Sequence, residues 1–185
     1  MIDTSILANA VEYIRQGGII AYPTEGVWGL GCDPYNKDAV IKILQLKDRP
    51  IEKGLILVAA SLQQITPLLG PLSQNYRSVL EASCPGPDTW LIPDTDQVIP
   101  SWIKGNFDTV AVRISLHPVV KSLCEKVGLL VSTSANPAGS NPALSRQQVE
   151  QYFGNEKIFI VPGELGKQAK PSVIRDLVSQ DVIRE

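Results

Sequence analysis

Two cations separated by one residue, Lys47 and Arg49, follow a predicted helix and immediately precede Pro50. Proline stiffens the backbone beside them, and an ammonium and a guanidinium held close together suit an anionic ligand. Upstream, the segment 23–31 (PTEGVWGLG) follows a short apolar run and contains three glycines, which permit close approach of a ligand to the main chain. We interpret residues 17–50 as one unit, in which an anion site faces a glycine-punctuated loop.

Further polar residues gather where predicted strands and helices end. They are Thr24 with Glu25, Lys53, Thr89, Thr109 with Arg113, the run 132–136 (STSAN), and Ser172 with Arg175. Ligands of open α/β sheets bind at strand ends. Cations beside hydroxyls and an amide suit a ligand with several oxyanions, such as a polyphosphate plus a carboxylate.

Each cluster also has a purely structural interpretation. Taken alone, Lys47 and Arg49 are more typical of a solvated helix end, where cations interact favourably with the helix dipole. The run 132–136 is equally typical of a turn in which Asn136 bonds its own backbone, and Arg113 is typical of a surface ion pair. The recurrence of these clusters favours a binding site but does not name its ligand.

Several classes of protein are disfavoured by what the chain lacks. His117 is the sole histidine and no GxSxG motif occurs, which argues against a Ser–His–Asp hydrolase and a histidine-rich metal site. Neither GxxxxGK[ST] nor GxGxxG is present. The net charge of −2 argues against a surface that coats nucleic acid, although it allows a local basic groove.

The three cysteines are widely spaced, which is typical of reduced thiols in a cytosolic protein. The N-terminus has no signal-peptide pattern, and no apolar run approaches the ~18 residues of a membrane span. We therefore expect a cytoplasmic protein that does not cross a membrane.

Alternating strand and helix patterns predict one domain, residues 1–185, built as an α/β fold with a mixed, twisted sheet and flanking helices. The predicted strands are 19–22, 54–60, 89–92, 109–114, 129–131, 158–161 and 182–184. The predicted helices are 8–15, 37–47, 61–70, 73–82, 118–127 and 145–153. Asn36 is a candidate helix cap, and SLQQ (61–64) and SRQQ (145–148) read as capping boxes. The long loop 94–108 is a candidate lid.

Six segments occur in the order and spacing of the YrdC/TsaC family, which the chain resembles over essentially its whole length. They are PTEGVWGLG (23–31), KDRP (47–50), PGPDT (85–89), VAVRIS (110–115), STSAN (132–136) and PSVIRD (171–176). KxR followed much later by SxN is the signature of this family of threonylcarbamoyl-AMP synthases. The resemblance implies a YrdC-like fold of the short, single-domain form, with a large, concave, basic cleft.

The resemblance also implies a reaction. L-threonine, bicarbonate or CO2, and ATP give L-threonylcarbamoyladenylate and diphosphate. Partner proteins then transfer the threonylcarbamoyl group to tRNA, so the reaction is the first step of N6-threonylcarbamoyladenosine (t6A) formation. Mg²⁺ is expected to be held through ATP, with no metal ligand from the protein.

The family's functional residues are carried over onto matching positions. Lys47 and Arg49 are expected to be catalytic and to bind ATP. The expected ATP-binding set also contains Lys53, Thr109, Ser134, Asn136 and Arg184, and the expected threonine-binding set contains Thr24, Arg113, Ser132 and Ser172.

The chain departs from the commoner family pattern at Gly26, where many relatives have a threonine that touches the amino acid, and at Val58, where some longer relatives have a histidine. Without the further domain of the long form, closure over the site is expected from its own loops or a partner. Two other functions remain open: a protein that binds double-stranded RNA or tRNA during ribosome or RNA maturation, and a regulatory nucleotide-binding domain.

Overall fold

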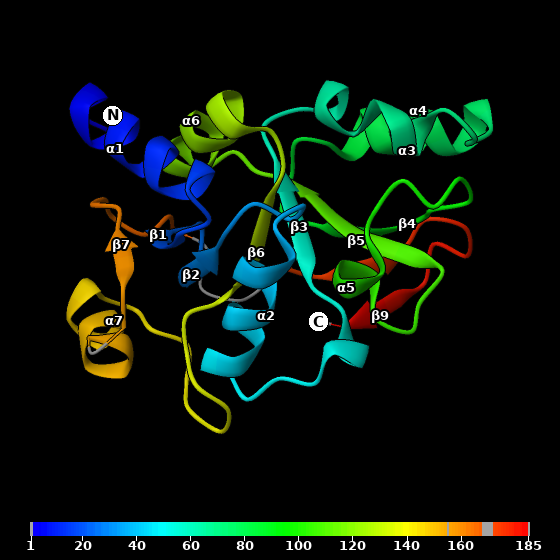
Figure 1. Cartoon of the computed structure of the whole chain (residues 1–185). Helices are drawn as coiled ribbons and strands as arrows, with labels where there is room; N and C mark the ends of the chain where they lie inside the picture. Colours follow the sequence, from blue (N-terminus) through cyan, green and yellow to red (C-terminus); the bar gives the residue numbers. More distant parts are fainter. Residues whose placement is uncertain (1, 155, 168–171, 185) are drawn as a thin grey trace.

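A mixed sheet runs through the molecule, and the helices lie against its two faces (Figure 1). The computed structural model describes residues 2–154, 156–167 and 172–184. In these ranges the strand order is β7-β1-β2-β6-β3-β5-β4-β8-β9. The strands are β1 Ile19–Pro23, β2 Trp28–Gly31, β3 Ile56–Ala59, β4 Thr89–Pro93, β5 Thr109–Ile114, β6 Leu130–Ser134, β7 Ile158–Ile160, β8 Ile174–Asp176 and β9 Val182–Arg184. The pairs β1–β7, β3–β5 and β4–β8 are parallel and the others antiparallel, so the prediction of a mixed sheet is confirmed.

The bounds of the helices are α1 Thr4–Arg15, α2 Lys37–Leu46, α3 Thr66–Leu69, α4 Gln74–Ser83, α5 Ser101–Lys104, α6 Pro118–Val127 and α7 Arg146–Phe153. Helices α1, α2 and α7 begin after residues whose side chains cap them. The side chains of Asn36 and Ser145 accept backbone N–H groups at the starts of α2 and α7, as predicted. Helix α1 starts earlier than predicted because the carboxylate of Asp3 accepts the N–H groups of Ser5 and Ile6.

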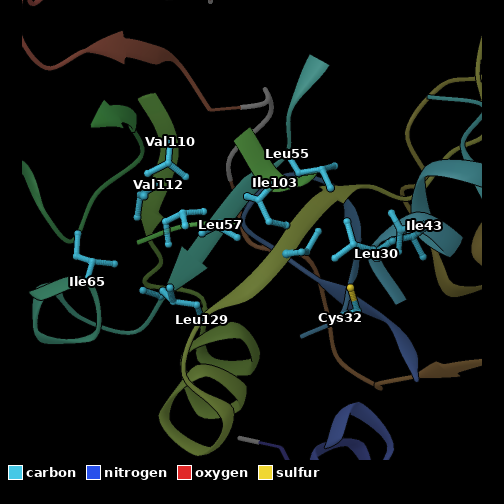
Figure 2. Packing of buried hydrophobic residues seen from close by; sticks show 14 of the residues in the cluster. Leu30, Cys32, Ile43, Leu55, Leu57, Ile65, Ile103, Val110, Val112 and Leu129 are labelled. Carbon is cyan, nitrogen blue, oxygen red and sulfur yellow. The ribbon is translucent and has the colours of Figure 1, made fainter. Parts of the chain in front are cut away.

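One face of the sheet is a continuous core. Leu57, Val110 and Val112 of neighbouring strands belong to the same buried cluster as Ile103 of α5. Ile43 of α2 lies beside Leu30 in that cluster (Figure 2). Helices α3, α4 and α7 contribute to the same cluster of buried residues. The buried side chains of β5 recur at every second position. This strand therefore has a period of two with one face buried.

The opposite face is covered differently. Helices α1 and α6 lie side by side (Figure 1) and pack on Ile20, Tyr22, Val58 and Leu130. The remaining positions on this face belong to β3, β5 and β6. They are Ile56, Ala111, Arg113, Ser132 and Ser134, and they line cavities instead of packing under a helix.

Three local predictions were wrong. The segment 23–31 is not one loop, because Trp28–Gly31 is a strand that pairs with both β1 and β6. The residues 61–70 form a 3-10 turn, Leu62–Ile65, followed by the short α3, and the Ser61 side chain makes no cap hydrogen bond. The segment 94–108 contains α5 and is anchored by buried Ile99 and Ile103, so it forms a wall of the core and not a free loop.

Within the described ranges, none of the helices is long and apolar enough to span a membrane. Pro171, the first residue of the PSVIRD segment, lies outside those ranges.

The glycines of β2 provide a test of this packing. A Cβ at Gly31 would lie 2.4 Å from the carbonyl oxygen of Val131 and 2.8 Å from the Tyr22 ring. We expect Gly31→Ala to lower the free energy of unfolding by about 1–3 kcal/mol through overpacking. Urea unfolding followed by circular dichroism measures this free energy of unfolding.

Gly70→Ala is the matched control. Gly70 has helical φ and ψ angles of −50° and −51°, and a Cβ there would come no closer than 3.7 Å to the neighbouring atoms considered. This substitution should be neutral or stabilising by up to about 1 kcal/mol, because alanine restricts the unfolded chain. Equal effects of the two substitutions would contradict the packing described for Gly31.

Candidate active site

A polar cavity of about 330 Å³ opens on the half of the sheet face that α1 and α6 leave uncovered. Its walls come from the turn after β1, from strands β2, β3, β5 and β6, and from residues near the end of α2 and in β9. The lining contains Thr24, Gly26, Val27, Gly29, Arg49, Leu55, Ile56, Arg113, Ser132, Thr133, Ser134, Pro142, Ser172 and Arg184. Most of the predicted threonine and ATP residues therefore meet in one place.

Strand register builds the floor of this cavity. Ile56 of β3 pairs with Ala111 of β5 on one side and with Ser132 of β6 on the other. Gly29 of β2 pairs with Ser134 and leaves room above it. The predicted position at a strand end is confirmed for Ser134, the last residue of β6, whereas Ser132 lies inside that strand and Arg113 lies one residue before the end of β5. They point to the same side because paired residues of adjacent strands share a face.

Three arginines give the cavity its charge. Arg113 is paired with Glu25, with 3.3 Å between Nη2 and Oε2. Arg49 donates to the carbonyl oxygens of Lys53 and Gly54, and Arg184 donates to that of Ser172. Burial, followed by the charge of Arg184, lowers the pKa of Arg49. The cavity thus has a charge-balanced end at Arg113 and a cationic end where Arg49 and Arg184 repel one another.

A second cavity of about 210 Å³ adjoins the first and shares Arg49, Leu55, Ile56 and Arg184 with it. It contains the predicted ATP residues Lys53 and Thr109. Its other lining residues are mainly apolar and include Leu91, Ile103, Phe107, Ile174 and Ile183. Phe107 and Ile183 are more than half exposed, at 56% and 58%. The pair Arg49 and Arg184 therefore stands between a polar compartment and an apolar one.

Lys47 lines neither of the two cavities. Helix α2 ends with Asp48 in the left-handed region (φ 45°). The N–H groups of Asp48 and Arg49 bond back to Gln45 and Leu44, which is a Schellman ending. After this turn the guanidinium of Arg49 donates to the carbonyl oxygens of Lys53 and Gly54.

The Lys47 ammonium instead holds the segment 134–136. It donates to the carbonyl oxygen of Ser134, to that of Asn136 at 2.8 Å, and to Asn136 Oδ1 at 3.4 Å. The residue is only 6% exposed. Burial, and then the charge of Arg49, lower the pKa of Lys47 to about 8.

Asn136 also faces away from the two arginine-lined cavities. Its amide nitrogen donates to the carbonyl oxygens of Pro137 and Ser140, and its Oδ1 accepts from the hydroxyl of Ser134 at 2.6 Å. Lys47, Ser134 and Asn136 therefore form one hydrogen-bonded network, and Ser134 is its member that reaches the cavity.

Behind the main cavity lies an inner chamber of about 50 Å³. Its polar lining includes Arg113, Glu25 and hydroxyls from Thr24, Thr89, Ser115, Ser132 and Ser172. The hydroxyls of Thr89 and Ser172 lie 2.7 Å apart. The Thr24 hydroxyl donates to the carbonyl oxygen of Val27, so toward a ligand it can only accept. Sequence reasoning listed Thr89 and Glu25 among polar clusters but did not assign them to the site.

Comparison with known proteins identifies the family. The family model Sua5_yciO_yrdC, described as "Telomere recombination", matches residues 12–185. The chain belongs to this family. It is 53% identical over 184 residues to a protein of Pseudomonas aeruginosa (strain UCBPP-PA14) and 48% identical to one of Pseudomonas entomophila. Both are named threonylcarbamoyl-AMP synthase, and each alignment covers 100% of this chain and 99% of the relative.

A solved member of this Sua5/YciO/YrdC family is Sua5 from P. abyssi complexed with L-threonine. It superposes with a TM-score of 0.82 at 32% identity, over 92% of this chain. The superposition covers 50% of that protein, so the chain corresponds to about half of it. The predicted membership of the family and the predicted α/β fold are confirmed.

The Lys47 network predicts a pH-dependent loop. As the pH rises through about 8, neutral Lys47 keeps two N–H donors for three acceptors. We expect hydrogen-exchange protection factors of the Asn136 and Ser140 amides to fall, while those in α5 stay constant. Lys47→Met should show low protection in the segment 134–140 at every pH. Constant protection in wild type from pH 7 to about 9 would contradict this role of the ammonium.

Unlike the protection factors, the contribution of Lys47 to the free energy of unfolding should increase as the pH rises. The pKa of Lys47 is lowered from 10.5 to about 8 on folding, so between these values the unfolded chain retains a proton that the folded chain has lost. The contribution of Lys47 to the free energy of unfolding therefore rises with pH in this window. Comparing wild type with Lys47→Met in urea at several pH values isolates that contribution.

Proposed function

We propose that the chain is a threonylcarbamoyl-AMP synthase that uses L-threonine, bicarbonate or CO2, and ATP, and releases diphosphate. One observation carries this proposal: a single cavity joins a charge-balanced, hydroxyl-lined end to a cationic end that opens into an apolar compartment. A zwitterionic amino acid, a polyphosphate and a purine nucleoside are ligands with the corresponding chemistry. The names of relatives at about half identity support the same activity.

The reaction requires positioning more than it requires a protein nucleophile. The amine of L-threonine adds to CO2 and loses a proton, which gives a carbamate. A carbamate oxygen attacks the α-phosphorus of ATP, the bond from the α-phosphorus to the bridging oxygen breaks, and diphosphate leaves with its electron pair. Holding the reactants in line and stabilising negative charge are the contributions expected of the protein.

We assign the phosphates to Arg49, Arg184 and Ser134, at the cationic end of the cavity. L-threonine is assigned to Thr24, Arg113, Ser132 and Ser172, around the inner chamber. Lys53 and Thr109 face the second cavity, where the nucleoside would lie. Lys47 and Asn136 act through the segment 134–136, which they fix, and not by direct contact with phosphate.

A divalent cation fits this site only through the nucleotide. Among the described residues, no group of three or more His, Cys, Asp or Glu side chains could hold a metal ion, and the cavity offers arginines and hydroxyls. When bound to the phosphates of ATP, Mg²⁺ supplies further charge neutralisation. The chain's own residues would orient the phosphate oxygens that carry it.

The product is an acyl phosphate anhydride and needs a consuming enzyme. We propose that it passes to the proteins that complete t6A on tRNA, that this takes place in the cytoplasm, and that residues 1–185 act as a single domain. All site residues come from one sheet and its connections, which supports the last point.

Release of diphosphate tests the proposed function. Purified protein is incubated with ATP, Mg²⁺, bicarbonate and one amino acid at a time, and diphosphate is measured. We expect release that requires both L-threonine and bicarbonate. ATP binding without release would indicate a regulatory domain, and salt-sensitive binding to duplex RNA without release would favour RNA maturation; either result would reject the synthase.

Arg49 should be essential to that activity. We expect Arg49→Ala to lower kcat/KM by about 10²-fold or more, because it removes a charge from the phosphate end of the cavity. Arg175→Ala is the matched control: Arg175 bonds Asp88 and lines neither arginine-lined cavity, so its activity should stay near that of wild type. Wild-type rates for Arg49→Ala would remove Arg49 from the mechanism.

A further inference from the structure

Glu25 makes more long-range polar contacts than its position in a hairpin turn suggests. Its side chain is 16% exposed. Oε1 accepts from the Ser115 hydroxyl at 2.7 Å, from the Leu116 N–H at 3.2 Å and from the His117 N–H at 3.3 Å. All three donors belong to the turn between β5 and α6, about ninety residues away in the sequence. Glu25 therefore locks the β1–β2 hairpin to the end of β5.

The second carboxylate oxygen of Glu25 therefore points in a fixed direction. With Oε1 held by three donors, Oε2 is fixed in the direction of Arg113, and it lies 3.3 Å from Nη2. Arg113 borders both the main cavity and the inner chamber. The rotamer of this arginine thus depends on a carboxylate whose own orientation is set by the rigid start of α6.

The surroundings of Glu25 also favour the ionised form of its carboxylate. Burial alone would raise its pKa, but the Arg113 charge and the Ser115 hydroxyl overcome that effect and hold the pKa of Glu25 below its ordinary value. The carboxylate is therefore ionised at neutral pH. This makes the threonine end of the cavity electrically balanced, in contrast to the end that contains Arg49 and Arg184.

We propose that Glu25 is a positioning residue that fixes the Arg113 guanidinium as the receptor for the carboxylate of the amino-acid substrate. The inference rests on the proposed function for the identity of that substrate. Glu25 acts through Arg113 and is assigned no contact with ATP. Its role is to give Arg113 one orientation, since a bidentate match to a carboxylate depends on the direction of the guanidinium.

Glu25→Gln is the first test, measured as KM for L-threonine and KM for ATP in the diphosphate assay. If the amide oxygen keeps the three donors of the β5–α6 turn, the amide N–H₂ must face Nη2 of Arg113, donor against donor. Arg113 is then displaced. We expect KM for L-threonine to rise about 10- to 100-fold, while KM for ATP changes by less than about threefold.

Asp94→Asn is a matched control for loss of a buried carboxylate. Asp94 also accepts two backbone N–H groups, from Val98 and Ile99, and pairs with a cation, Lys104, at 2.7 Å. The Asp94→Asn substitution should lower the melting temperature without raising KM for L-threonine. A general structural role for Glu25 would produce the same pattern in Glu25→Gln, and that result would overturn the proposal.

Two further variants cover a failure to fold. Glu25→Asp keeps the charge but is one methylene shorter, so it cannot span both the α6 turn and Arg113; it should also weaken L-threonine selectively. In an Arg113→Ala background, Glu25→Gln should cause no further loss of L-threonine affinity, measured by calorimetry, because the two residues act as one unit. Additive losses would overturn the proposal.

The result is separable from that of the proposed function. If wild type releases no diphosphate with L-threonine, the function itself is rejected. If wild type is active and Glu25→Gln keeps the wild-type KM for L-threonine, only the positioning role is rejected.

Discussion

The site depends on one constraint, the two-residue period of strands that are buried on one face only. In β5, Val110, Val112 and Ile114 enter the core, so Thr109, Ala111 and Arg113 must point to the other side. The register with β3 and β6 then adds Ile56 and Ser132 to the same surface. Shifting β5 by one residue would bury Arg113 in the core and expose its valines to the cavity. The alternation that packs the core therefore also places the residues of the site.

Helix coverage decides what that second face becomes. Where α1 and α6 lie on it, Ile20, Tyr22, Val58 and Leu130 complete a small core. Further along the same strands the side chains are small or polar, and the space holds a cavity of about 330 Å³. Burying a guanidinium under a helix would require full compensation of its charge. Leaving the face open lets Arg49, Arg113 and Arg184 keep access to solvent or a ligand.

The hydrogen-bond or ion-pair partner of each arginine in the cavity determines how much of its positive charge is compensated. The Arg113 and Glu25 pair is nearly neutral as a unit, whereas Arg49 and Arg184 satisfy part of their donors with carbonyl oxygens and keep their net charge. A neutral carbonyl partner orients a guanidinium without cancelling its attraction for phosphate. The difference between these two kinds of partner separates an amino-acid end from a phosphate end.

Much of this arrangement could be predicted from sequence because its causes are local. The strand 109–114 was predicted with its correct bounds, and the caps Asn36 and Ser145 predicted two helix starts. The strand Trp28–Gly31 was missed because its glycines have low strand propensity, and pairing with β1 and β6 overrides that propensity. The contact of Glu25 with Arg113 has no local signal, since it joins residues that only the fold brings together.

Lys47 and Arg49, two residues apart in the KxR motif, have different hydrogen-bond partners. The spacing KxR suggests two cations that face one anion, yet the intervening Asp48 takes a left-handed conformation that usually favours glycine. That turn directs Arg49 to the cavity and Lys47 to the carbonyl oxygens of Ser134 and Asn136. By donating to these carbonyl oxygens, the Lys47 ammonium fixes the backbone from which Ser134 reaches the cavity. Under the proposed function, Lys47 would support phosphate binding through the backbone geometry that it imposes on Ser134.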